Sequence, residues 1–228
     1  MSKLNSFIKL MRNKKELLNC IFFTLLTQVL ITMAIIKLFY NIENVTHLKD
    51  ILNSKIYIFI LLLFFIISLI LIFIMISSNL TYFQKYIVFI LFSLIEAFFI
   101  YLILSRFNNE VIRFAFYSTI LIFISLFIFG LIIVYFGYDL GWMGFLLFIS
   151  LLILIIIQLI SLCFKDLKIH NKFIAVCSII IFMLYIIYDT NNILLKYKNN
   201  NHFCIIGALD YYLDIINIFI NLLRYSSD

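Results

Sequence analysis

Seven long apolar segments constrain the fold of this chain more than any other feature. Each is close to the ~20 residues that a helix needs to cross the hydrocarbon of a bilayer. In hydrocarbon only helices and closed barrels satisfy their backbone groups, and continuous apolar runs lack the alternation of barrel strands. We therefore predict an all-α integral membrane protein, a bundle of seven transmembrane helices. The predicted spans are Leu17–Tyr40, Ile56–Ser78, Tyr86–Ser105, Phe114–Tyr138, Leu140–Phe164, Phe173–Leu195 and Phe203–Leu223.

The composition agrees with a membrane location. Only 12% of the 228 residues are charged, against the roughly 25% that is usual in soluble domains. A basic cluster precedes the first span, and such clusters stay on the cytosolic side. We expect a cytosolic N-terminus (1–16), one membrane domain (17–223) and a short C-terminus (224–228), with the last span either crossing fully or entering and returning. Since the basic cluster serves orientation, the net charge of +6 does not indicate nucleic-acid binding.

Three aspartates lie inside the last two apolar segments. They are Asp189, Asp210 and Asp214. A charged side chain at the centre of a membrane helix costs ~2.5–3.5 kcal/mol, and such residues usually face the bundle interior and line an ion or proton pathway. The alternative role is structural, as protonated acids that hydrogen-bond between helices.

Polar residues on the last two spans repeat at helical spacing, so each set shares one face of its helix. The two sets are Asp210, Asp214, Asn217 and Asn221, continued by Gly207, and Ser178, Tyr185, Asp189 and Asn192. Because sequential spans are antiparallel neighbours, we expect the two faces to line one cavity, with Tyr185, Asn192 and Asn217 among its lining residues. Glu96 in the third span is either a further wall of this cavity or a structural acid.

The partner of Asp189 is open from the sequence. A rise of ~1.5 Å per residue places Asp189 and Asp210 at similar depth and Asp214 nearer the centre of its span. Depth therefore favours a pair of Asp189 and Asp210. Lys37 lies close enough to the end of the first span to extend to the membrane surface, and Lys196 can do the same from the sixth span. The acids are then left without a counter-charge inside the membrane. Paired carboxylates then share a proton or bind a cation, and calcium prefers such hard oxygen ligands.

The other reactive residue types indicate no enzyme. No phosphate-binding glycine loop and no serine nucleophile motif occurs. The histidines fall in predicted loops, so no zinc site is expected within the helices; they are His47, His170 and His202. The cysteines lack paired spacing and are expected to be small buried residues, neither disulfides nor ligands; they are Cys20, Cys163, Cys177 and Cys204. No tightly bound cofactor is expected.

Two motifs in the last two spans resemble the Bax inhibitor-1 family, the transmembrane Bax inhibitor motif proteins. They are IIYDTNNIL (Ile186–Leu194) and ALDYYLDIINIFINLL (Ala208–Leu223). The similarity extends more loosely to LTQVLIT (Leu26–Thr32), SLIEAFF (Ser93–Phe99) and FGYDLGWMG (Phe136–Gly144). It is nearest to the Golgi anti-apoptotic protein branch, which has poxviral members. The second predicted span has no basic residue that could latch the aspartates, which counts against a salt-bridge gate.

The resemblance implies a pH-sensitive calcium leak in Golgi or endoplasmic reticulum membranes of eukaryotes or their viruses, which lowers store calcium and inhibits apoptosis. By motif position it implies that Asp189 and Asp214 are the pH sensor and a transient calcium site. Asp210 and Glu96 match further acidic positions of the family. The expected partners are the lipid bilayer and calcium ions. The alternative function is that of a non-conducting regulator, which binds calcium-release channels or death-pathway proteins.

Overall fold

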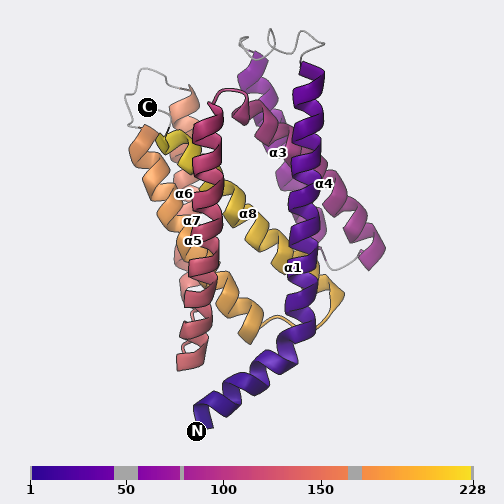
Figure 1. Cartoon of the computed structure of the whole chain (residues 1–228), viewed down its shortest axis with the longest axis vertical. Coiled ribbons are helices and arrows are strands. Elements are labelled where there is room, and N and C mark those ends of the chain that lie inside the picture. Colours follow the sequence, from indigo (N-terminus) through magenta and orange to yellow (C-terminus); the bar gives the residue numbers. More distant parts are fainter. Residues whose placement is uncertain (1, 44–55, 78–79, 164–170, 227–228) are drawn as a thin grey trace.

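The computed structural model describes residues 2–43, 56–77, 80–163 and 171–226 (Figure 1). Within these ranges seven segments are α-helical and no strand occurs. The predicted all-α fold of seven helices is confirmed. The helices are α1 (Ser2–Glu43), α3 (Ile56–Ile76), α4 (Tyr82–Leu104), α5 (Asn109–Phe136), α6 (Met143–Cys163), α7 (Asn171–Leu195) and α8 (Asn201–Ser226).

The observed helices follow the predicted spans closely at most ends. Five of the described helices are long and apolar enough to cross a membrane: α1, α4, α5, α7 and α8. The largest difference is at α1, which begins at Ser2 and so includes the basic N-terminal segment in the helix. Figure 1 shows this first part bending away from the rest of α1. The predicted span ends at Ser78 and Phe164 lie outside the described residues.

Helix α8 lies at the centre of the bundle and crosses it obliquely (Figure 1). It packs against α1, α4, α5 and α7, while α3 packs on α4 and α6 packs on α7. Its 26 residues form one uninterrupted helix, which at ~1.5 Å per residue is longer than the ~30 Å of bilayer hydrocarbon. A segment that enters and returns needs a break in the helix, so α8 has the form of a full span.

Specific residues begin and end the helices. Thr81 caps α4, because its hydroxyl accepts a hydrogen bond from Gln84 N while the Gln84 side chain accepts one from Thr81 N. Helix α5 ends at Gly137, whose φ of 89° lies in the left-handed region that glycine tolerates best.

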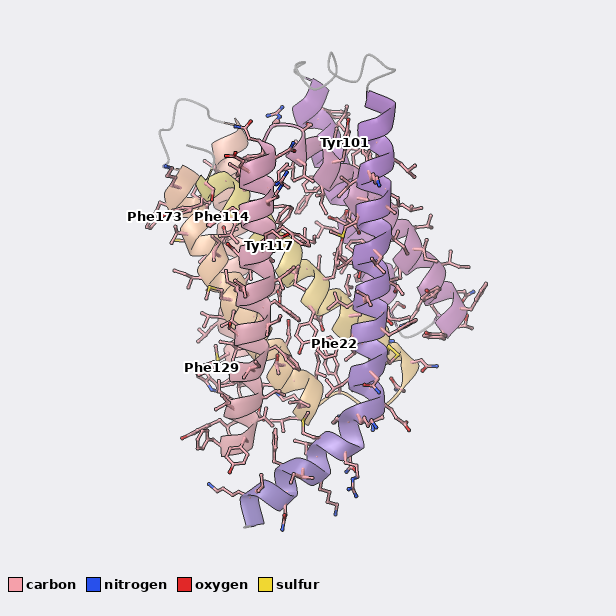
Figure 2. All side chains as sticks on the ribbon, viewed as in Figure 1. Phe22, Tyr101, Phe114, Tyr117, Phe129 and Phe173 are labelled. Carbon is pink, nitrogen blue, oxygen red and sulfur yellow. A yellow bond between two sulfur atoms is a disulfide. The ribbon has the colours of Figure 1, made fainter. Side chains whose placement is uncertain are left out.

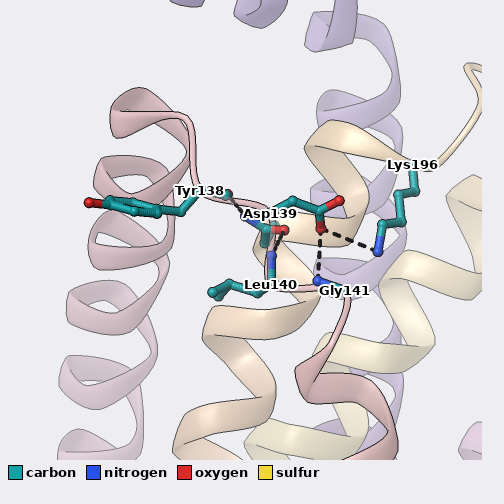
Figure 3. Close-up of polar contacts among 6 residues, drawn as sticks. Tyr138, Asp139, Leu140, Gly141 and Lys196 are labelled. Atoms are coloured by element: carbon teal, nitrogen blue, oxygen red, sulfur yellow. Dashed lines mark hydrogen bonds and ion pairs between the residues drawn. The ribbon is translucent and has the colours of Figure 1, made fainter.

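The turn after α5 is held by α7 (Figure 3). Asn191 on α7 accepts a hydrogen bond from Leu140 N at 3.0 Å and donates one to Tyr138 O at 2.8 Å. Asp139 accepts a hydrogen bond of 2.7 Å from Gly141 N, and its carboxylate lies 3.4 Å from Lys196 Nζ. These contacts set the register of α5 and α6 against α7.

Three glycines allow helices to approach closely, as small residues do in membrane bundles. A Cβ on Gly130 of α5 would lie 2.7 Å from Thr190 Cβ of α7, and one on Gly207 of α8 would lie 2.7 Å from Ile21 Cδ1 of α1. A Cβ on Gly144 of α6 would meet the Tyr188 hydroxyl of α7. Gly207, expected on the polar face of its span, instead lies against Ile21.

The structure corrects two predictions about reactive residues. Cys20 of α1 and Cys204 of α8 form a disulfide, with their Cα atoms 5.7 Å apart. The prediction of no disulfide was wrong because 184 residues separate this pair in sequence, and only the packing of α1 on α8 brings it together. His202 lies in the first turn of α8, not in a loop, and its Nδ1 is 2.5 Å from Lys85 Nζ. His47 and His170 lie outside the described residues.

Large apolar side chains project from the outer sides of the bundle (Figure 2). Phe73, Phe145 and Phe23 are 78%, 72% and 70% exposed. In water such a surface would drive aggregation, whereas in a bilayer it contacts lipid tails. The exterior therefore agrees with a multi-pass membrane protein.

Candidate functional site: a buried aspartate pair between α7 and α8

Two of the three predicted aspartates meet inside the bundle. Asp189 on α7 and Asp214 on α8 are both buried, 7% and 3% exposed, and their carboxyl groups are joined by a hydrogen bond. Two carboxyl groups can hydrogen-bond only when one carries a proton, so this contact suits a pair that shares one proton. The sequence left the partner of Asp189 open between Asp210 and Asp214, and the hydrogen bond joins it to Asp214.

The third aspartate, Asp210, has a different partner. The Tyr197 hydroxyl, from the turn between α7 and α8, donates a hydrogen bond of 2.6 Å to Asp210 Oδ2. Burial and the negative charge of Asp210 raise the pKa of Tyr197, so its hydroxyl stays protonated and remains a donor. Asp210 is near enough to act electrostatically on both Asp189 and Asp214. The three acids therefore form one cluster, in which Tyr197 is the protein donor to Asp210.

Tyr197 is itself tied to the N-terminal part of α1. The Lys14 ammonium donates a hydrogen bond to the Tyr197 carbonyl oxygen, and the Asn199 side chain donates one of 2.6 Å to Asn13 O. These contacts join α1 to the turn that covers the acidic cluster. Sequence reasoning did not single out Tyr197, because a tyrosine in a polar turn carries no signal of its tertiary partner.

Two polar atoms on the faces of the last two helices, Asp214 Oδ2 and Asn192 Oδ1, are buried without a hydrogen-bond partner among the described residues. Both amide atoms of Gln28 on α1 are also buried without one there. Buried polar groups usually find a partner in protein, ordered water or an ion. Tyr185, half-buried on α7, lies within electrostatic reach of Asp189 and Asp214.

The remaining predicted lining residues are placed as follows. Asn217 and Asn221 on α8 donate hydrogen bonds of 2.8 Å to carbonyl oxygens of their own helix. Glu96 on α4 is buried and accepts a hydrogen bond of 2.7 Å from Ser68 of α3. This hydrogen-bond partner lies on α3, which packs on α4. Ser178 donates to Ile174 O within α7.

No cation neutralises the cluster within the described part of the chain. None of the three aspartates forms an ion pair there with lysine, arginine or histidine, and no group of three or more acidic, histidine or cysteine side chains is arranged to hold a metal ion. A calcium ion passing the Asp189–Asp214 pair would take carboxylate oxygens first. Amide, carbonyl or water oxygens would complete its shell of six to eight ligands.

The chain is similar to known proteins over part of its length. A stretch of 87 residues, 38% of the chain and 34% of the relative, is 38% identical to Protein LIFEGUARD 4 of Arabidopsis thaliana. Uncharacterized proteins of Campylobacter jejuni and Helicobacter pylori are 38% and 41% identical over 86 residues, which are 38% of this chain and 36% of each of those proteins.

The matched stretch is about a third of the length of these curated relatives. The relatives come from bacteria as well as from a plant, so the similarity selects neither the Golgi branch nor a poxviral origin. The family described as inhibitor of apoptosis-promoting Bax1 matches residues 14–227. This range includes α3 to α8 in full and all of α1 except its first turns. The chain therefore belongs to the Bax inhibitor-1 family.

Proposed function

We propose that this protein is a pH-sensitive calcium leak of an internal store membrane, with the Asp189–Asp214 pair as its proton-controlled cation site. The observation that carries the proposal is the direct hydrogen bond between two buried carboxyl groups that have no basic partner among the described residues. A packing contact needs no ionisable pair, since an asparagine would supply the same hydrogen bond.

The pair has two states with different chemistry. While it shares a proton it carries at most one negative charge and holds α7 against α8. When that proton leaves, two negative charges face each other, and they must separate or bind a cation. Calcium binds ionised carboxylates and competes with protons for them. Acidification is thus expected to close the path and alkalinisation to open it.

The proposed effect on apoptosis follows from the family, and the orientation in the membrane follows from the charge pattern. Loss of store calcium through such a leak would reduce the calcium available for release. Inhibition of apoptosis by this route would fit the family description, inhibitor of apoptosis-promoting Bax1. We assign the basic N-terminal part of α1 to the cytosolic side, because lysine and arginine clusters stay there. On this orientation the acidic cluster lies in the cytosolic half of α7 and senses cytosolic pH.

The test is calcium efflux from liposomes that contain only the purified chain, measured at pH 6 and pH 8. We expect faster efflux at pH 8 and loss of the pH response in Asp214→Asn and in Asp189→Asn. Asp139→Asn is the matched control, since it removes an exposed acid from the α5–α6 turn. Glu96→Gln is a further control. It removes a buried acid outside the aspartate pair, which accepts a hydrogen bond from Ser68, and is expected to leave the pH response in place.

Absence of calcium efflux through the well-folded protein at both pH values would overturn the proposal. A leak with unchanged pH response in both aspartate variants would overturn the assigned site while leaving the leak. In the first case the alternative, a non-conducting regulator, explains the family membership better. Protection of cells from apoptosis by the same non-conducting protein would then support that alternative.

A further inference from the structure

An apolar cavity whose lining includes none of the three aspartates lies between helices of the bundle. It has a volume of about 850 Å³ and is bounded by α1, α4, α5 and α8. Phe22 of α1 and Tyr117 of α5, both labelled in Figure 2, stand on its two sides, and Tyr212 of α8 lies on its floor. Leu26, Met33 and Ile120 line it and are 56%, 44% and 40% exposed, so the cavity opens between α1 and α5 toward the bilayer. We call it the α1–α5 groove.

The middle of the groove has no polar group that needs a ligand. The Thr32 hydroxyl is 3.0 Å from the Tyr212 hydroxyl and also donates to Gln28 O at 2.9 Å. The Thr119 hydroxyl donates to Ala115 O at 2.7 Å. The other walls there are aliphatic or aromatic. This stretch therefore suits hydrocarbon.

One end of the groove carries two positive charges. Lys37 and Arg113 both line it, and they lie at the same end of the bundle, because α1 ends where α5 begins (Figure 1). Both side chains are exposed. Neither forms an ion pair with a described residue, including Glu110 one turn before Arg113. Two cations at the rim of an apolar groove complement an anionic head with an apolar tail.

We propose that the α1–α5 groove binds an anionic membrane phospholipid, with an acyl chain along its apolar wall and the phosphate between Lys37 and Arg113. The groove follows α1 from Phe22 to Lys37, which at ~1.5 Å per residue is ~22 Å. One leaflet contributes ~15 Å of hydrocarbon, half of the bilayer core. The groove is long enough for one chain, and Lys37 and Arg113 then reach the level of the headgroups.

Charge and volume favour a lipid over a second copy of this chain. The cavity volume falls within the ~300–1,000 Å³ that is typical of small-molecule sites. Arginine and lysine form charge-assisted hydrogen bonds with phosphate, so Lys37 and Arg113 at the rim of the groove suit an anionic headgroup. The described outer faces of α3, α5 and α6 are apolar and offer no row of acids to pair with Lys37 and Arg113.

The test uses quenching of tryptophan fluorescence by brominated lipid in the full-length protein. Trp142, the single tryptophan, is first replaced in Trp142→Phe. Phe116→Trp then reports from the groove, and Phe145→Trp, at a site 72% exposed on α6, reports from bulk lipid. The probe is phosphatidylglycerol with brominated chains, diluted into phosphatidylcholine vesicles. Brominated phosphatidylcholine is the neutral control.

We expect half-maximal quenching of the Phe116→Trp protein at a mole fraction of phosphatidylglycerol on the order of thirtyfold lower than for Phe145→Trp, since two basic groups near the surface contribute about one kcal/mol each. Adding Lys37→Gln and Arg113→Gln should move the Phe116→Trp curve onto the bulk curve. Both side chains are exposed, so these variants should fold. Tyr117→Trp is the second reporter if Phe116→Trp is unstable.

Three results would each overturn the proposal. Coincident curves for the two reporters would mean that the groove has no preference over bulk lipid. Equal quenching by brominated phosphatidylcholine and phosphatidylglycerol at the groove would remove the headgroup recognition. Protection of the groove reporter from both lipids, together with a dimer, would identify a second copy as the occupant. The proposal does not depend on the calcium leak.

Discussion

The Tyr197 hydroxyl donates a hydrogen bond of 2.6 Å to Asp210 Oδ2, and so a turn residue supports an acid of the central helix. The same tyrosine is tied through its carbonyl oxygen to Lys14 of α1. The acidic cluster is therefore covered, at the end of α7, by a turn that two other parts of the chain hold in place. Opening of the cluster toward that end requires this turn to move.

Loss of the Tyr197 hydroxyl should destabilise the fold. Tyr197→Phe keeps the ring and removes the donor, and a hydrogen bond to an acidic group contributes ~1.5–3 kcal/mol. We expect a decrease of that order in the free energy of unfolding, measured by denaturation in mixed micelles. Tyr138→Phe is the control, because Tyr138 is 65% exposed in the α5–α6 turn. Equal stability of the two variants would show that the Tyr197–Asp210 bond contributes nothing.

The Cys20–Cys204 disulfide should be detectable by thiol labelling. Maleimide uptake by the denatured protein is expected to rise by two on reduction, because the bond joins two of the four cysteines. Reduction should also lower the free energy of unfolding by ~2–5 kcal/mol, since the bond closes a long loop. A chain with both Cys20→Ser and Cys204→Ser should show neither change. Unchanged labelling on reduction of the wild-type protein would contradict the bond.

The two close helix contacts at glycine should respond differently to alanine. Gly130→Ala places a Cβ against Thr190 Cβ, which cannot move without α7, and should destabilise the fold by ~1–3 kcal/mol. Gly207→Ala meets Ile21 Cδ1, the end of a flexible side chain, and should cost less. Ile21→Val, which removes that atom, should restore the stability of Gly207→Ala in thermal unfolding. The same stability loss for both glycines, without this rescue, would argue against the packing described.

The α5–α6 turn should contribute to the pH dependence of stability through Asp139. The hydrogen bond from Gly141 N, with Lys196 nearby, lowers the pKa of this carboxyl from its usual 3.8. A carboxyl whose pKa is lowered on folding stabilises the fold above its unfolded-state pKa. That contribution is lost as the pH falls through the folded-state pKa.

Asp139→Asn should therefore lower the melting temperature slightly at pH 7, and this difference should disappear as the pH falls through the folded-state pKa. The effect is small because the Asp139 side chain is 60% exposed and solvent screens its charge. Glu110→Gln, which removes another exposed acid, is the comparison. An equal loss at pH 7 and at pH 3 would mean that the negative charge of Asp139 does not stabilise the turn.

The amino-acid sequence by itself determined the number and type of the helices. A run of about 20 apolar residues has one stable form in hydrocarbon, because a helix satisfies its backbone within the segment. Helix ends agree with the predicted spans to within a few residues except at α1, where the basic segment continues the helix. The polar faces of the last two spans could also be predicted from the sequence, since they follow from helical spacing alone.

Only the tertiary structure decided which of these residues meet. Asp189 shares a hydrogen bond with Asp214, Glu96 accepts one from Ser68, and Cys20 bonds Cys204. The contacts of Asp214 and Cys204 depend on how α8 crosses the bundle (Figure 1). The crossing angle depends on small contacts such as that of Gly207 with Ile21. Helical periodicity specifies a face but neither its height nor its neighbour. Those depend on packing between helices that lie far apart in the chain.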